Sequence, residues 1–183
     1  MFSSRFRSFD FFFLTGQCIT FGSNECYELG HPGNQPLPLK KLDRKAIAVS
    51  CGDKFTVILV NSGEIYSCGV GASVGHPHGN NVLQAERIEG LVGEHITTIA
   101  AGSCHTLVLS IDGKCFAWGR GVQGALGLGE SGLQHVQTPQ QVPLSFASIH
   151  GAPVGIAAGY DHSVLWTVDG TIFHHLQTFH SVI

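Results

Sequence analysis

Histidine and cysteine are the residues of this 183-residue chain whose side chains could carry chemistry. Eleven histidines and six cysteines supply the imidazole and thiolate groups that bind zinc and other transition metals. Two loops, His31-Pro32-Gly33 and His76-Pro77-His78-Gly79, could present imidazoles to a metal or to a partner. Neither loop has a cysteine or a carboxylate at ligand spacing beside it in the sequence. We therefore favour a turn role for these loops and predict no metal site.

The remaining candidates for chemistry are also weak. His174, His175 and His180 form only a loose cluster. No two cysteines are spaced as C-x-x-C, and a nucleophilic thiol needs a base and an orienting group that the sequence does not specify. The segment Gly119–Gly124 has the letters of a dinucleotide-binding fingerprint, but the glycine-rich residues that follow it do not suit the helix that such a site needs. We predict reduced thiols, no catalytic residue and no cofactor, and hence a protein that is not an enzyme.

An internal repeat organises these residues. Segments beginning at Gly52, Gly102 and Gly159 each contain an apolar run, a turn glycine (Gly63, Gly113 or Gly170) and a second apolar run. The units are 50 and 57 residues apart. Two apolar runs joined by Asp-Gly, as at Asp112-Gly113, are typical of a β-hairpin. Each unit continues with a glycine-rich loop, a polar segment and a last apolar strand, which makes about four short strands.

Units of four strands are too thin to bury a face alone and predict blades packed around an axis. In Thr56–Leu59 and Thr106–Leu109 both strand faces are apolar, which suits a strand between two neighbouring sheets. The fold class predicted is all-β, with β-propeller blades of four-stranded antiparallel sheets. The propeller is incomplete and open, with about three to four blades.

Equivalent positions in the units indicate which residues are structural. His105 and His162 stand where another copy has Phe55, so we expect packed, hydrogen-bonded side chains at this position. Cys68 stands where Trp118 stands. The positions assigned to blade structure are Gly52, Gly63, Gly69, Gly102, His105, Gly113, Trp118, Gly119, Gly127, Gly159, His162 and Gly170. The residues predicted for turns or for interaction loops are His31, Asp53, His76, His78, Arg120 and Asp161.

Composition excludes several classes of function. Charged residues make up 13% of the chain and the net charge is −3, without the basic face of a nucleic-acid-binding protein. No apolar stretch approaches a membrane span. Residues 1–14 form a divergent, phenylalanine-rich segment. Asp10 interrupts its short apolar run, which argues against a secretory signal. We interpret the segment as a strand of the first, incomplete repeat. These features predict a cytoplasmic or nuclear protein.

The repeat resembles the regulator of chromosome condensation repeat. The residues that carry the resemblance are Gly102, His105, Thr106, Asp112, Gly113, Trp118, Gly119, Gly124, Leu126, Gly127 and Leu128. It covers about residues 15–175 and implies part of a seven-bladed propeller in which several blades combine strands of adjacent repeats. Repeats are expected at 15–50, 51–100, 101–157 and, in part, 158–183, within one domain of residues 15–183. The match decays at both ends, which favours a fragment of a larger protein.

The resemblance leads to two hypotheses about function. The first is a protein–protein interaction module or scaffold, whose partner is another protein. The alternative is a guanine nucleotide exchange factor for a small GTPase, which the resemblance allows, although no residue here matches the wedge used by such factors. The open ends of a partial propeller also predict self-association or pairing with missing blades.

Overall fold

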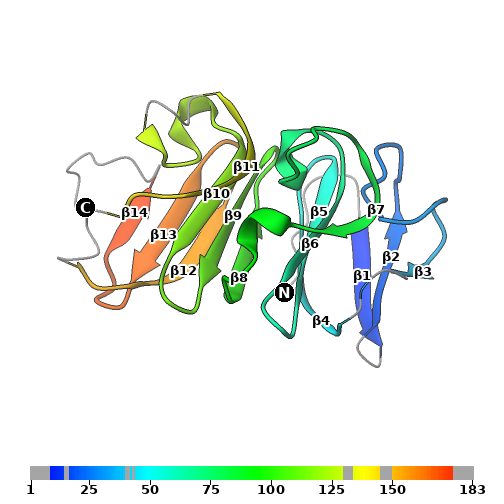
Figure 1. Ribbon diagram of the computed structural model, residues 1–183, viewed down its shortest axis with the longest axis horizontal. Coiled ribbons are helices and arrows are strands. Elements are labelled where there is room, and N and C mark those ends of the chain that lie inside the picture. Colours follow the sequence, from blue (N-terminus) through cyan, green and yellow to red (C-terminus); the bar gives the residue numbers. More distant parts are fainter. Residues whose placement is uncertain are drawn as a thin grey trace.

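Four antiparallel β-sheets follow one another along the chain in the computed structural model (Figure 1). The structure describes residues 9–14, 17–39, 42, 44–129, 134–144 and 150–174. Within each sheet the strands pair with their sequence neighbours, in the orders β1-β2-β3, β4-β5-β6-β7, β8-β9-β10-β11 and β12-β13-β14. The predicted all-β architecture of unclosed propeller blades is confirmed, and the two central sheets have the predicted four strands.

The bounds of the elements follow the repeat. The first two sheets contain β1 (Phe9–Leu14), β2 (Gln17–Gly22), β3 (Leu37–Pro38), β4 (Ala46–Cys51), β5 (Phe55–Val60), β6 (Ile65–Gly69) and β7 (Val82–Arg87). The next two contain β8 (Ile96–Ala101), β9 (His105–Ser110), β10 (Cys115–Arg120), β11 (His135–Gln141), β12 (Pro153–Ala158), β13 (Ser163–Thr167) and β14 (Ile172–His174). Short 3₁₀ turns occur at η1 (Ala72–Val74), η2 (Glu89–Leu91) and η3 (Val122–Gly124).

Glycine turns make the central hairpin of three sheets. Gly63, Gly113 and Gly170 have φ angles of 84°, 76° and 88°, a backbone conformation that glycine adopts without a steric penalty. Each donates its backbone N–H to the carbonyl three residues earlier, at 2.9–3.0 Å. The recurring turn glycine therefore sets where the second strand ends and the third begins.

Repeats and sheets are offset by one strand. The last apolar strand of each repeat pairs with the first long strand of the next repeat, as where Cys51 of β4 lies opposite Thr56 of β5. The same pairing joins β8 to β9 and β12 to β13. Each of these three sheets thus contains strands from two adjacent repeats. Phe9–Leu14 pairs with β2 along its whole length, in agreement with the strand interpretation of this segment.

The hydrophobic core lies between the sheets. Every residue of β5 and of β9 is buried, because each of these strands is covered on both faces. One core cluster joins the second and third sheets through Phe55, Val108 and Trp118. A second joins the third and fourth sheets through Leu107 and Leu165. Burial alternates along β13, so one face of this strand remains exposed.

At three equivalent positions in the repeat, the ring of a side chain packs against the glycine three residues before it, which we call a ring-on-glycine contact. A Cβ atom added to Gly52, Gly102 or Gly159 would lie 1.9–2.1 Å from the ring of the residue three positions later, which is Phe55, His105 or His162. The glycine N–H also donates to the carbonyl of that residue at 2.8–2.9 Å. Glycine is required here because the ring occupies the space of a side chain.

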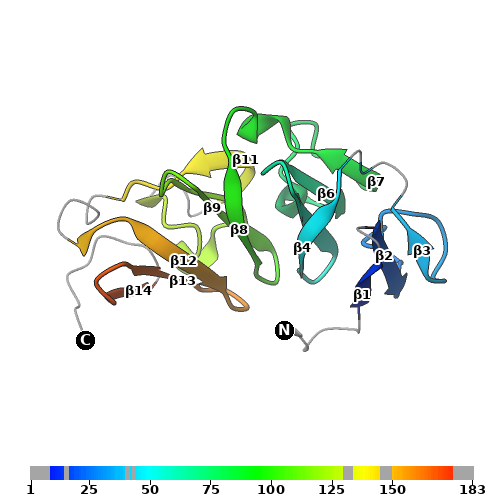
Figure 2. The ribbon, with the colours of Figure 1, turned by 90° about the horizontal axis from the view of Figure 1, so that it is seen from below.

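Backbone hydrogen bonds connect successive sheets at equivalent positions. The N–H of Asp53 donates to the carbonyl of Ser103 at 2.8 Å, and the N–H of Ser103 donates to the carbonyl of Tyr160 at 3.2 Å. These residues follow the glycines of the ring contacts. Figure 2 shows the neighbouring first strands β4, β8 and β12, which lead into these turns. Among the described residues, no helix has the length and apolar character needed to cross a bilayer.

Candidate functional site

An open groove of about 920 Å³ lies on the outer part of the second sheet. It is lined by Arg44, Glu64, Tyr66, His76, Pro77, His78, Ala85, Glu86, Arg87 and Glu89. Tyr66 and Ala85 are also part of the core cluster between the first and second sheets. The groove therefore has a rigid floor, and its charged residues lie at its rim.

A hydrogen-bond chain holds His76 at this groove. The Ser67 hydroxyl donates to the Val74 carbonyl at 2.6 Å and lies 2.9 Å from His76 Nε2. A serine hydroxyl has one hydrogen, so Ser67 accepts the second bond and His76 carries a proton on Nε2. Burial lowers the pKa of His76 below its usual value. The imidazole of His76 is therefore neutral and held in one orientation.

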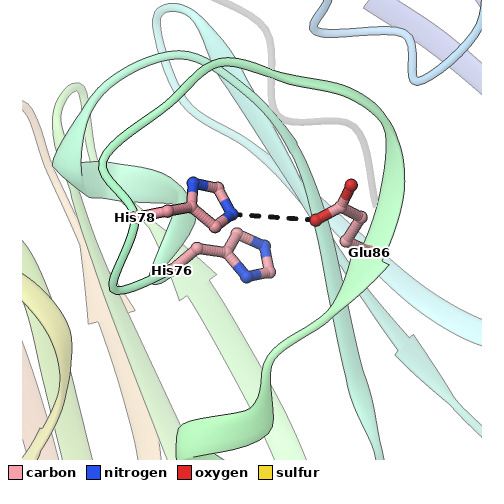
Figure 3. Close-up of side chains that lie close together, drawn as sticks. All are labelled: His76, His78 and Glu86. Atoms are coloured by element: carbon pink, nitrogen blue, oxygen red, sulfur yellow. Dashed lines mark ion pairs between the residues drawn. The ribbon is translucent and has the colours of Figure 1, made fainter.

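His78 and Glu86 lie beside His76 (Figure 3) and are exposed, whereas His76 is buried. The two imidazole rings are stacked, with centroids 5.2 Å apart and planes 5° apart. His78 Nε2 lies 3.8 Å from a Glu86 carboxylate oxygen, with the two side chains 39% and 48% exposed. His78 Nδ1 accepts the backbone N–H of Asn80 at 3.0 Å. One ligand atom from each of His76, His78 and Glu86 lies within 4.8 Å of the other two.

The sequence leaves two interpretations for His31 and His76, a turn role, which is favoured, and imidazoles presented to a partner or a metal. The two side chains are only 6% and 5% exposed, which agrees with the favoured turn role. His31 places its ring nitrogens beside the carbonyls of Thr20 and Pro32. The carboxylate expected to be missing near His76 is supplied by Glu86, which β7 brings opposite Ser67 of β6. The position of Glu86 could have been predicted by pairing the two strands on either side of the loop, because residues directly opposite each other share one face of a sheet.

Arg87 cross-links the other side of the groove. Its guanidinium donates to Glu64 at 2.9 Å and to both carboxylate oxygens of Glu89 at 3.0 and 3.1 Å. Hydrogen bonds from Ser62 and Arg87 lower the pKa of Glu64. These exposed pairs orient the rim of the groove and contribute little stability.

The other predicted loop residues lie outside the groove lining. Asp53 and Asp161 are partly buried, and the N–H of Asp53 bonds Ser103 in the series that connects the sheets. Arg120 donates its backbone N–H to the Cys104 carbonyl at 2.8 Å. The structure does not bring these three residues to the cluster of His76, His78 and Glu86.

The equivalent positions His105 and His162 differ in how far their side chains are buried. His105 is 1% exposed, and its Nε2 lies 3.0 Å from the hydroxyl of Ser163 in the next sheet. His162 occupies the same repeat position but is exposed, contrary to the expectation of a packed side chain. It keeps the contact with its glycine. The difference is that β9 is covered on both faces, whereas β13 is not.

The cysteines are all free thiols. Burial raises the pKa of Cys18 and of Cys115 to about 12 and the pKa of Cys51 to about 11. The pKa of Cys68 is raised in the same direction by burial, and its thiol lies 3.3 Å from the Glu28 carbonyl. These four thiols are protonated at neutral pH, so they pack as small apolar groups.

Comparison with known proteins identifies similar sequences. The regulator of chromosome condensation (RCC1) repeat matches residues 15–59 and 112–166, and a second model of the same repeat matches 46–73 and 96–125. The chain is 30% identical to the human E3 ubiquitin-protein ligase HERC2 over 156 residues, 81% of this chain and 3% of that protein. It is 31% identical to the ultraviolet-B receptor UVR8 of Arabidopsis thaliana over 170 residues, 87% of this chain and 37% of the receptor.

Solved structures show the same fold. Human WBSCR16 aligns with a TM-score of 0.78 at 23% identity, over 86% of this chain and 42% of that one. Yeast RCC1 (Prp20), solved with Kap60, aligns with a TM-score of 0.74 at 20% identity, over 91% and 43%. This chain spans less than half the length of each of these four proteins. The sequence matches and the shared architecture together place the chain in the regulator of chromosome condensation (RCC1) repeat family.

Proposed function

We propose that this chain is a protein–protein interaction module without enzymatic activity, acting in the cytoplasm or nucleus. The observation that carries the proposal is the groove on the second sheet, with its rigid floor and charged rim. Tyrosine and arginine, both present in its lining, are enriched among the residues that dominate binding energy at protein interfaces. An extended protein segment with an aromatic or arginine anchor suits a groove of this kind.

The buried polar groups form part of the framework behind the groove. The Trp118 indole donates to the Ser73 carbonyl at 2.8 Å, and Thr56 donates to the Glu28 carbonyl at 2.7 Å. The hydroxyls of Ser67 and Ser163 also donate to backbone carbonyls. These contacts maintain the sheets, which leaves the groove and exposed faces for recognition.

The exposed face of the fourth sheet supports association with another sheet. Trp166 and Ile172 lie opposite each other on β13 and β14 and are 38% and 65% exposed. Leu165, on the other face of β13, is fully buried against the third sheet. We propose that a second copy of the chain or further propeller blades cover this apolar face.

The proposal is tested by placing a photo-crosslinking amino acid at Glu89 in the groove, with Asp112 in an exposed hairpin turn as the matched control. A partner added in purified form should crosslink from position 89 and not from 112, and Arg87→Glu should weaken its binding. Equal crosslinking from both positions, or binding unaffected by Arg87→Glu, would contradict the groove as the interface.

The exchange-factor alternative requires a separate assay. The structure of Prp20p from Saccharomyces cerevisiae is known together with its binding properties toward Gsp1p and histones. These are properties of Prp20p. A panel of small GTPases loaded with fluorescent nucleotide tests the alternative directly. We expect no acceleration of nucleotide release by this chain, and acceleration with any GTPase would overturn the interaction-only function.

A further inference from the structure

We propose that His76, His78 and Glu86 form a zinc-binding site in the groove. This reverses the sequence-based prediction of no metal site, because the missing carboxylate is present in space. Two imidazoles and one carboxylate are a ligand set that suits Zn²⁺ and leaves a fourth position for water or another donor. The site lies in the groove lining, so that fourth position is accessible from solvent.

The distances allow the ligands to converge with small movements. The three candidate ligand atoms lie within 4.8 Å of one another. Two donors on one tetrahedral zinc ion are about 3.4 Å apart, given bond lengths of about 2.0–2.1 Å. The side chains that must move are those of His78 and Glu86, which are 39% and 48% exposed, so rotamer changes are sterically open to them. His76 is the fixed member.

The surroundings of His76 favour a metal ligand. His76 is buried, and its ring is held in one orientation, so its position as a ligand is set before an ion binds. Ser67 orients the ring through a hydroxyl that is itself fixed by the Val74 carbonyl. An outer partner that fixes the ring of a histidine ligand is a regular feature of zinc sites.

Zinc binding at His78 should move a proton. His78 Nδ1 accepts the Asn80 N–H at 3.0 Å, so the neutral ring carries its proton on Nε2, which faces Glu86. When Nε2 binds zinc, the Nε2 proton leaves to solvent and Nδ1 takes up one proton from solvent, so the ring keeps a single proton and Nδ1 can no longer accept the Asn80 N–H. The Asn80 amide is exposed and forms its lost bond with water. The amide signal of Asn80 therefore reports on zinc binding at this site.

The consequence for the molecule is a cross-link between a loop and a strand. Pro77 separates the two histidines and restricts the backbone of the loop, while Glu86 belongs to β7. Bound zinc joins these segments across the groove and offers its open position to a carboxylate or imidazole of a bound protein.

The test is a titration of the full chain with zinc chloride by calorimetry, repeated with cobalt(II) to read the ligand geometry from visible absorption. We expect saturation at one ion per chain. His78→Ala and Glu86→Gln should each weaken binding at least about tenfold, as loss of even an outer partner does in zinc sites. His135→Ala, which removes an exposed histidine of β11, is the matched control and should bind as the parent does. All variants are first checked for parental circular dichroism.

Amide NMR supplies the second measurement. At a zinc concentration just sufficient to saturate the parent, zinc should shift the Asn80 signal fully in the parent and in His135→Ala, and much less in Glu86→Gln. The proposal is overturned if His78→Ala and Glu86→Gln bind zinc as tightly as the parent, if binding does not saturate, or if the Asn80 signal stays unchanged at saturation.

Discussion

The imidazole of His105 and the hydroxyl of Ser163 join two neighbouring sheets at a distance of 3.0 Å. Ser163 donates its single hydrogen to the Ala125 carbonyl at 2.6 Å, so His105 is the donor between them. Ser67 makes the corresponding pair of bonds with Val74 and His76. In both places a serine holds a buried histidine as a neutral donor.

Stability should fall as the pH decreases from 6.5 to about 4. Burial lowers the pKa of His105 from 6.5 to about 4. Between these values the unfolded chain binds a proton that the folded chain does not, so acid favours unfolding. The full difference amounts to about 3 kcal/mol once the pH is below 4, and it vanishes above 6.5. Urea unfolding measured between pH 7.5 and 4 checks this expectation.

Two variants isolate the contribution of His105. His105→Phe places the residue found at Phe55 in the equivalent position, and it should remove the part of this pH dependence that comes from His105, leaving the part that comes from His76, whose pKa is also lowered by burial. His135→Ala lacks an exposed histidine and should keep it. An unchanged pH profile in His105→Phe would show that other groups cause the acid sensitivity.

Gly102→Ala should destabilise the protein through overcrowding. The added methyl group would lie 2.1 Å from the His105 ring and 2.6 Å from the Gly159 carbonyl oxygen of the next sheet. We expect a loss at or above the upper end of the roughly 1–3 kcal/mol that overpacking costs. Thermal and urea unfolding measure the loss.

Gly129→Ala is the comparison for Gly102→Ala. Gly129 has a φ of 65° and open space around its Cα, so this variant carries backbone strain alone, about 1–2 kcal/mol. Equal losses in the two variants would contradict the ring-on-glycine explanation.

Trp118→Ala should cost about 3–5 kcal/mol. Trp118 is fully buried between the second and third sheets, and its indole bonds the Ser73 carbonyl. Trp166→Ala should cost clearly less, because Trp166 is 38% exposed. In a Trp166→Phe background, the remaining fluorescence should come from a buried indole and shift to longer wavelength on unfolding. A long-wavelength emission already in the folded state would refute this placement.

The six thiols should separate into two classes toward a thiol reagent such as Ellman's reagent. Cys26 and Cys104 are partly exposed and should react first. Cys18, Cys68 and Cys115 are buried and Cys51 is partly buried. All four have raised pKa values, so little thiolate is available and they should react only as the protein unfolds. Cys26→Ser/Cys104→Ser should abolish the fast phase, whereas six equal rates would contradict the raised pKa values of the other four. Denaturant should expose all six.

The fold can be predicted from the sequence because the same residue types recur at the same positions of several repeats. The hairpin glycine at Gly113 and the ring position at His105 recur with fixed spacing, and each has one local physical cause. The cluster with Glu86 was missed because it depends on the pairing of β6 with β7 across a loop. The burial of His76 was missed for a related reason, since a side chain in a loop gives no periodic pattern. The exposure of His162 depends on the neighbouring sheet, which a position within a repeat does not encode.

The one-strand offset between repeats and sheets has a consequence for how such chains evolve. The strands β4, β8 and β12 each belong to one repeat but pair within the sheet of the following repeat. When unequal recombination inserts or removes one whole repeat, every internal sheet therefore still has its first strand. The sheet of the inserted repeat takes its first strand from the repeat before it. The last strand of the inserted repeat in turn becomes the first strand of the following sheet. Copy number can therefore drift in this architecture without an intermediate that has a broken sheet in its interior.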